Sequence, residues 1–214
     1  MKVAILSESS ADEAAVRVLV EALLEQPTEP VALNPRSRGW PSVLQVLPKV
    51  LLHLHFHTDA DGLIVVVDTN GSPLQAPAPD EPAGAGPIPR SEQLLAAVRE
   101  FHNRHPERPG RPPLQVAIGV AAPAIEAWYL CGRDQRASEV SWIREMREGA
   151  RPRDRVNGMK QTVYGTDRPS LELETEHAVQ EAHRIARDTS LLERAFPVGF
   201  GLLARAIHAW KDVT

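Results

Sequence analysis

Apolar residues follow two patterns along this chain, unbroken runs and helical spacing. The unbroken runs at 2–7, 62–68 and 114–122 have the length and composition of buried strands. Between these runs, apolar residues at helical spacing predict helices over about 11–25 and 91–104. Strands that alternate with helices in this way predict an α/β fold with a mostly parallel central sheet flanked by helices.

Capping and proline residues help to place the remaining elements of the first half. Ser10–Glu13 has the form of a capping box and predicts the start of the first helix. A weak strand is predicted at 31–34. The segment 41–57 is ambiguous, because Pro41 suits the first turn of a helix whereas Pro48 would kink one.

After the strand 114–122 the sequence carries helical patterns, and beyond residue 131 it shows no convincing strand. A polar, arginine-rich link separates two of its predicted helices. The helices expected from the spacing of apolar residues lie at 123–130, 138–148, 174–188 and 198–211. We therefore predict an α/β core over residues 1–131 and a C-terminal helical annex over 132–214, packed on that core.

Composition narrows the class of protein. The 214 residues carry a formal net charge of −4, so the chain has no global basic field for non-specific nucleic-acid binding. Cys131 is the only cysteine, which excludes an intrachain disulfide and a cysteine zinc site. The sequence shows no signal peptide and no apolar stretch long enough to span a bilayer. We expect a soluble protein of the reducing cytoplasm, without a membrane partner.

Acidic residues follow the predicted strands. Glu8 comes directly after the first strand, Asp68 ends a central strand, and Glu126 lies in the first turn after the strand 114–122. If these strands are parallel neighbours, the three side chains meet at the edge where open α/β sheets bind ligands. Clustered carboxylates repel one another unless a cation lies between them, and oxygen ligands suit Mg²⁺ or Mn²⁺.

Helix capping offers a second explanation for some of these acids, because the helix dipole stabilises carboxylates in the first turn. Capping is the preferred interpretation for Glu13, and both interpretations stay open for Asp12. The Pro-rich segment 71–90, which follows Asp68, has few anchoring residues. It suits a mobile flap beside the acidic edge or a plain insertion.

The motifs around these acids resemble the TOPRIM domain. Glu8-Ser-Ser-Ala-Asp12-Glu13 follows one strand, and Asp68-Thr-Asn70-Gly follows another. The resemblance is closest to small TOPRIM-like proteins of bacteria and archaea related to the nuclease domain of the OLD family. The stretch Ala-Ile-Gly-Val-Ala-Ala-Pro-Ala-Ile-Glu-Ala-Trp, residues 117–128, resembles that group's third strand and its Glu-Ala-Trp helix. Similar features towards the C-terminus are Lys160 in MKQTVYG and a helical tail with Phe196 and Phe200.

This resemblance implies a TOPRIM-like fold and metal-dependent hydrolysis of phosphodiester bonds in DNA or RNA. One or two Mg²⁺ or Mn²⁺ ions would be held by Asp68, Asn70 and Glu8, or Glu8 would act instead as general acid and base. Glu126 would be a further ligand or would orient one, and Lys160 would contact the phosphate. The family also implies a setting in defence against mobile DNA, and an ATPase as a possible partner protein.

Two positions depart from the family pattern. Ser9 replaces the usual glycine after the first glutamate, and Asn70 replaces the second aspartate of Asp-x-Asp. An amide oxygen can ligate a cation but brings no charge, so the metal should bind more weakly. Either Asp12, Glu13 or Glu126 supplies the missing charge, or the chain is a catalytically degenerate binding or regulatory subunit. A hydrolase of a small phosphorylated metabolite is a third possibility, because it needs no basic groove.

The segment 150–160 contains the main local excess of positive charge. Arginine and lysine side chains suit phosphate contacts. The alternative is a solvated loop whose charges balance the acidic stretch 172–181. The candidate phosphate-binding residues are Arg151, Arg153, Arg155 and Lys160.

The stretch HLHFH, residues 53–57, has the residue types of a zinc site. On a strand, His53, His55 and His57 would share one face, whereas on a helix only His53 and His57 would do so. A helix end, where histidine stabilises the terminal carbonyls, is the preferred interpretation. The role of the three histidines stays open.

Overall fold

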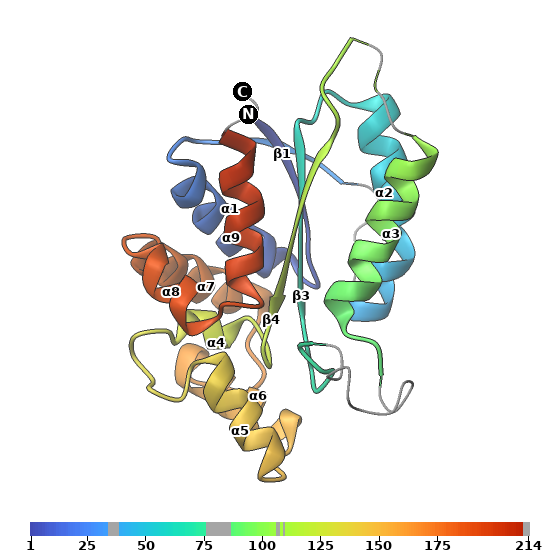
Figure 1. Ribbon diagram of the computed structural model, residues 1–214. Coiled ribbons are helices and arrows are strands. Elements are labelled where there is room, and N and C mark those ends of the chain that lie inside the picture. The colour runs from blue at the N-terminus through green and yellow to red at the C-terminus, as the bar shows by residue number, and fades with distance from the viewer. Residues whose placement is uncertain (34–38, 76–86, 106–107, 109, 212–214) are drawn as a thin grey trace.

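A computed structural model describes residues 1–33, 39–75, 87–105, 108 and 110–211 of the chain (Figure 1). It shows an α/β fold with one four-stranded parallel sheet in the order β2-β1-β3-β4, which confirms the predicted fold class at this level. The strands are β1 (Lys2–Leu6), β2 (Glu29–Val31), β3 (Gly62–Asp68) and β4 (Gln115–Ala121).

The register aligns the carboxyl ends of the central strands. β3 pairs with β4 along its whole length, from Gly62 opposite Gln115 to Asp68 opposite Ala121. β1 pairs with the first half of β3, with Leu6 opposite Val65. Residues that follow these strands therefore emerge at one edge of the sheet, as the sequence predicts.

Helices cover both faces of the sheet. Figure 1 shows α2 and α3 on one face and α1 and α9 on the other. The short helix α4 follows β4 directly. The helices are α1 (Ser10–Leu24), α2 (Trp40–His57), α3 (Arg90–Arg104), α4 (Glu126–Tyr129), α5 (Glu139–Arg147), α6 (Pro152–Tyr164), α7 (Leu171–Ile185), α8 (Thr189–Ala195) and α9 (Phe200–Lys211).

Successive side chains of each strand point to opposite faces of the sheet and so contribute to two apolar layers. Val3 and Ile5 of β1 point to the layer that contains α1 and α9, whereas Ala4 and Leu6 point to the layer of α2 and α3. The C-terminal helices contribute Phe200 and many other side chains to the first layer. The segment from α5 to α9 therefore packs on the core of the sheet.

The structure settles several local expectations. The residue that caps α1 is Ser9, one position before the predicted capping box, because its Oγ accepts the N–H of Asp12 at 3.2 Å. The ambiguous segment 41–57 is helical throughout α2, with Pro48 inside it. β2 begins before the predicted 31–34 strand and ends at Val31.

The predicted polar link contains a helix, α6, and a second helix, α8, was also missed. The first half of α6 is polar, and its buried residues Met159, Val163 and Tyr164 all lie in the second half, which hides the helical spacing. α8 is seven residues long and buries only Leu192, too little for a periodic pattern.

Two further expectations concern the Pro-rich segment and membrane-spanning helices. The Pro-rich segment 71–90, expected to be a flap or a plain insertion, lies largely outside the described residues. Among the residues that the structure does describe, no helix is both long and apolar enough to cross a membrane.

Gly199 is predicted to be essential to the join between α9 and β4. A Cβ atom at this position would overlap the backbone carbonyl oxygen of Val120, which cannot rotate away. We expect Gly199→Ala to lower the free energy of unfolding by about 2–3 kcal/mol, measured by urea denaturation.

The matched control is Gly158→Ala in α6, where a Cβ atom would meet no atom within 4 Å. Because alanine is the better helix former, this change should raise the stability by up to about 1 kcal/mol. Equal effects of the two substitutions would contradict the packing argument.

Candidate functional site

The candidate site lies where the order of the strands reverses. After β1 the chain forms α1 on one face of the sheet, and after β3 it forms α3 on the opposite face. The carboxyl ends of these two neighbouring strands border the crevice in which open α/β sheets bind their ligands. Glu8 and Asp68 stand at these two ends, as the sequence predicts.

Backbone contacts hold Glu8 and Asp68 against each other. The N–H of Asp68 donates to Oε1 of Glu8 at 3.0 Å, and Nη1 of Arg90 lies 3.4 Å from the same oxygen. Arg90 also donates to the backbone carbonyl of Asp68, and its guanidinium lies over the ring of Trp40, 4.7 Å from the centroid. One arginine from the start of α3 therefore joins both strand ends and the start of α2.

The turn after β4 fixes the side chain of Asp68. Oδ1 of Asp68 accepts the N–H of Ile125 at 2.9 Å. The backbone N–H groups of Thr69 and Asn70 donate to the carbonyls of Ala121 and Pro123 at 2.8 and 2.9 Å. These bonds extend the β3–β4 ladder past the last strand residue and place α4 beside Asp68.

Glu126 supplies a buried carboxylate, one oxygen of which has no hydrogen-bond partner among the described residues. Its side chain is almost completely buried, and Nζ of Lys160 lies 3.6 Å from Oε1. Among the described residues, Oε2 of Glu126 and the hydroxyl of Tyr164 both lack a partner in hydrogen-bonding geometry. The Tyr164 hydroxyl nevertheless interacts with Glu126 and helps to lower its pKa. A buried carboxylate oxygen is costly to leave unpaired.

Burial and mutual repulsion raise the pKa values of Asp68 and Asp12. Burial, then the charges of Glu126 and Glu8, raise the pKa of Asp68 well above its ordinary value. Burial and the neighbouring charges of Glu126, Glu174 and Glu8 raise the pKa of Asp12 to about 7. The acids thus form one interacting group at physiological pH.

Lys160 is the cation inside this group. Burial alone would lower the pKa of its ammonium, but the carboxylates raise it above the ordinary value, Glu126 most and then Glu174 and Asp68. Lys160 therefore stays charged and offsets part of the negative charge. Burial raises the pKa of Glu126 even so.

Asn70 follows β3 at the exposed rim of the site. Its backbone has a φ of 46°, in the left-handed region that asparagine tolerates better than most residues. Next to it, a Cβ atom at Gly71 would lie 3.0 Å from Cγ of Pro152. The turn after Asp68 therefore touches the first residue of α6.

That contact brings part of the basic segment to the acidic edge. Arg151 and Arg153 flank Pro152 and are exposed. Arg155 instead pairs with Asp134 at 3.4 Å and with Glu145 at 3.2 Å. Of the four predicted phosphate contacts, Lys160 lies beside Glu126, and Arg151 and Arg153 flank the proline that contacts the turn after Asp68. Arg155 is bound to other side chains.

The available donors fit a hard divalent cation in their chemistry. The acids offer carboxylate oxygens, the preferred ligands of Mg²⁺, and Oε2 of Glu126 is buried without a partner among the described residues. Within the described part of the chain, however, no three acidic, histidine or cysteine side chains are gathered as in an assembled metal site. An ion would have to draw the carboxylates of Glu8, Asp68 and Glu126 inward.

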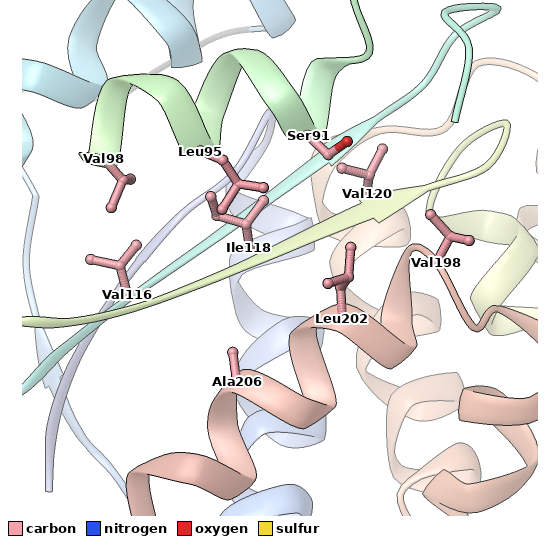
Figure 2. A pocket seen from close by; sticks show the side chains of 9 residues that line it. All are labelled: Ser91, Leu95, Val98, Val116, Ile118, Val120, Val198, Leu202 and Ala206. Carbon is pink, nitrogen blue, oxygen red and sulfur yellow. The ribbon is translucent and has the colours of Figure 1, made fainter. Parts of the chain in front are cut away.

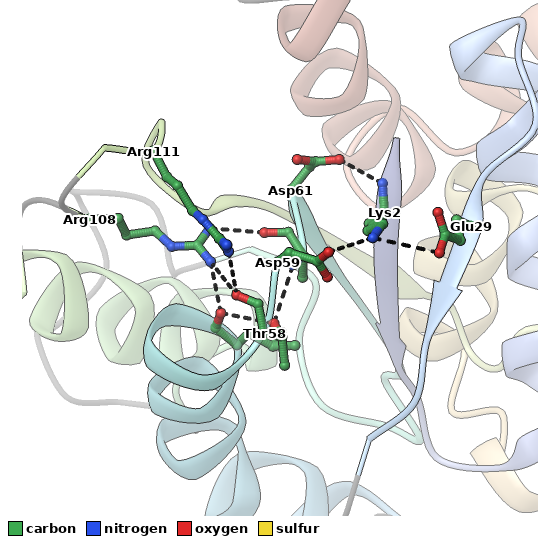
Figure 3. A network of polar contacts seen from close by, with 9 residues as sticks. Lys2, Glu29, Thr58, Asp59, Asp61, Arg108 and Arg111 are labelled. Carbon is green, nitrogen blue, oxygen red and sulfur yellow. Dashed lines mark hydrogen bonds and ion pairs between the residues drawn. The ribbon is translucent and has the colours of Figure 1, made fainter.

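At the amino ends of the strands, charged side chains pair with one another and with backbone groups (Figure 3). Lys2 forms ion pairs with Asp59 and Glu29, and its backbone N–H donates to Asp61. Arg108 donates to the carbonyls of His55, Ala60, Leu54 and Thr58. Acids at the amino ends of the strands are therefore neutralised by nearby cations.

The histidines of α2 do not form a three-ligand set. The helix places His53 and His57 on one exposed side, with their rings stacked 5.8 Å apart, whereas His55 is buried on another side. This arrangement agrees with the preferred helix-end interpretation. Among the described residues no third acidic, histidine or cysteine side chain joins His53 and His57 as in a metal site.

Four residues of the site were missed in the sequence. Arg90 had one available signal, because a cation in the first turn of a helix opposes the helix dipole and needs another reason to be there. Tyr129 follows Glu126 by three residues, and its buried hydroxyl adjoins the same acids, which raise its pKa further after burial itself. Glu174 and Tyr164 come from α7 and α6, and no local pattern marks them.

Comparisons with protein-family models, with curated proteins and with solved structures find no match to this chain. The resemblance to the TOPRIM domain therefore rests on the motifs in the sequence.

Asp12 gives the protein a pH dependence whose sign follows from its raised pKa. The pKa is about 7 in the folded protein against 3.8 for the ordinary side chain, so the folded state binds a proton that the unfolded state has released. The stability that this proton contributes is complete below 3.8 and is lost as the pH rises through about 7.

We therefore expect the Tm, measured without divalent ions, to fall more steeply from about pH 4 to about pH 7 in the wild type than in Asp12→Asn. All other ionisable groups are common to the two proteins, so the difference between the two curves reports Asp12 and its interaction with the neighbouring acids. Parallel curves would contradict the assignment.

Proposed function

We propose that this protein hydrolyses phosphodiester bonds of nucleic acid with a divalent cation, Mg²⁺ or Mn²⁺, bound at the acidic edge. The observation that carries the proposal is the buried Oε2 of Glu126, which has no hydrogen-bond partner among the described residues and lies among other carboxylates. Buried acids that repel one another cost stability, and a cation between them removes that cost.

Each residue of the site has a distinct task in this proposal. Asp68, Glu8 and Glu126 would hold the ion, with Asp12 and Asn70 as further oxygen donors. When bound, the ion would lower the pKa of a water molecule and neutralise charge on the phosphate. Oε1 of Glu8 is already oriented by the Asp68 N–H and by Arg90, so its other oxygen is the one available for an ion or a proton.

The cations of α6 supply the contacts to the substrate. Lys160 is held charged beside Glu126 and would bind a phosphate oxygen as negative charge develops on it. Arg151 and Arg153 are exposed beside the turn that follows Asp68 and would bind neighbouring phosphates. A net charge of −4 requires such local contacts, because the whole chain does not attract a polyanion.

A second function is favoured by the contact between Arg90 and Glu8. This arginine already neutralises part of the acidic edge, and Asn70 adds no charge there. Both features suit a non-catalytic protein that binds or regulates a partner such as an ATPase. The two functions differ in whether metal binding leads to cleavage.

Metal binding can be tested by thermal stability. A cation that binds only the folded state should raise the stability, by about 2.7 kcal/mol at a concentration one hundred times its Kd. Asp68→Ala should abolish the increase in Tm caused by Mg²⁺ or Mn²⁺. The control is Asp59→Ala at the opposite edge of the sheet, which should keep the full increase. An increase that survives Asp68→Ala would place the ion elsewhere.

Catalysis is tested by cleavage of single-stranded DNA, supercoiled DNA and RNA over a range of metal concentrations. We expect slow, Mn²⁺-favoured cleavage by the wild type and a lower metal requirement for Asn70→Asp, because the added charge attracts a divalent ion. Glu8→Gln should abolish cleavage in either background.

The control for Glu8→Gln is Glu25→Gln, which removes an exposed carboxylate paired with Lys211 and should leave cleavage unchanged. If wild type and Asn70→Asp bind metal but cleave no nucleic acid, the binding or regulatory function takes the place of the nuclease. Hydrolysis of small phosphate esters alone would indicate a metabolite hydrolase.

A further inference from the structure

The two outermost strands of the sheet, β2 and β4, form its lateral edges and are unlike each other. One edge is β2, which has only three residues and contains Glu29 and Pro30. Short strands, charges and proline are the features that keep a sheet edge from pairing with another chain. The other edge is β4, seven residues of sequence QVAIGVA with no charge and no proline. β4 lacks the protection that β2 has.

The outer side of β4 carries backbone groups without partners. Gln115 donates to the carbonyl of Asp61, and Ala121 accepts from Thr69, so odd-numbered residues of β4 point their backbone groups towards β3. The even-numbered residues point away from the sheet. Gly199 covers the carbonyl of Val120 closely. Among the described residues, the outward N–H and C=O groups of Val116 and Ile118 form no hydrogen bond.

An apolar groove surrounds these groups (Figure 2). Ile118 and its neighbours on β4 form the floor, and Leu95 of α3 and Leu202 of α9 stand on the two sides. Both leucines are more than a third exposed, at 39% and 38%. The groove has a volume of about 90 Å³, which is below the roughly 300–1,000 Å³ of small-molecule sites. Its size suits a few apolar side chains of another polypeptide.

We infer that this groove binds a second copy of the chain, with β4 pairing antiparallel to its own equivalent across a two-fold axis at Ala117. In that register Val116 lies opposite Ile118 of the second copy, and Ile118 lies opposite Val116 of the second copy. Antiparallel partners at such positions exchange two hydrogen bonds, so the two pairs use all four open groups on each strand. The two sheets then form one continuous eight-stranded sheet.

Charge favours the same partner. Glu92 and Arg99 lie on the same side of α3 as Leu95, one before it and one after it, and both are exposed. A two-fold axis at β4 sets α3 antiparallel to α3 of the second copy. Glu92 of each chain then faces Arg99 of the other, while the uncharged strands bring no like charges together.

The experiment is light scattering after size exclusion, over a range of micromolar concentrations. We expect the wild type to have twice the mass of one 23.5 kDa chain. Leu95→Glu and Leu202→Glu should each weaken association at least about tenfold, because they place a charge in the apolar groove. A wild type that stays monomeric at every concentration would overturn the inference.

Matched controls separate the groove from general surface effects. Leu52 and Leu191 are exposed to the same extent, 39% and 38%, but lie on α2 and α8 away from the groove. Leu52→Glu and Leu191→Glu should remain dimeric, and dissociation by all four changes alike would overturn the inference. Val116→Pro removes an outward N–H without removing a hydrogen bond of the β3 ladder and should also give folded monomers. A Val116→Pro dimer would exclude pairing through the strand.

Discussion

The alignment of the carboxyl ends of β1, β3 and β4 is the constraint on which the rest of this structure depends. Because these strands are parallel and in register, Glu8, Asp68 and Glu126 emerge at one edge instead of being distributed around the molecule. Like charges so placed repel, and their burial strengthens the repulsion. Cations from neighbouring helices offset part of this repulsion. Arg90 of α3 pairs with Glu8, and Lys160 of α6 pairs with Glu126.

The charges are arranged differently at the two ends of the strands. At the amino ends, Lys2 neutralises Asp59 and Glu29, and burial is slight. At the carboxyl ends, Asp12 and Asp68 are held with raised pKa values, although neutral residues of similar size would remove the repulsion. Proteins retain such stability costs at sites whose function needs them. This is the physical basis for proposing a cation at that edge.

Local patterns in the sequence predicted what lies within a strand or directly beside one. β3 was predicted with its observed bounds, Gly62–Asp68, because an unbroken run of apolar residues that ends at an aspartate is typical of a buried strand and does not fit the spacing of an amphipathic helix. The convergence of Glu8, Asp68 and Glu126 followed from the rule that parallel strands share their carboxyl edge. Arg90 and Glu174 were not predicted, because they reach the site through the packing of α3 and α7. Such contacts join residues that are far apart in the sequence and leave no periodic signal.

The identity of Asn70 is explained in part by the backbone. With a φ of 46° beside Gly71 at 90°, the turn after β3 needs residues that tolerate the left-handed region, and asparagine does so readily. An amide at this position is therefore not in itself a sign of lost function. The charge that an aspartate would bring has a nearby equivalent in Glu126, buried and close enough to raise the pKa of Asp68. Water screens a buried charge less than one at the exposed rim, so a cation bound beside Glu126 would be held more strongly than one beside residue 70.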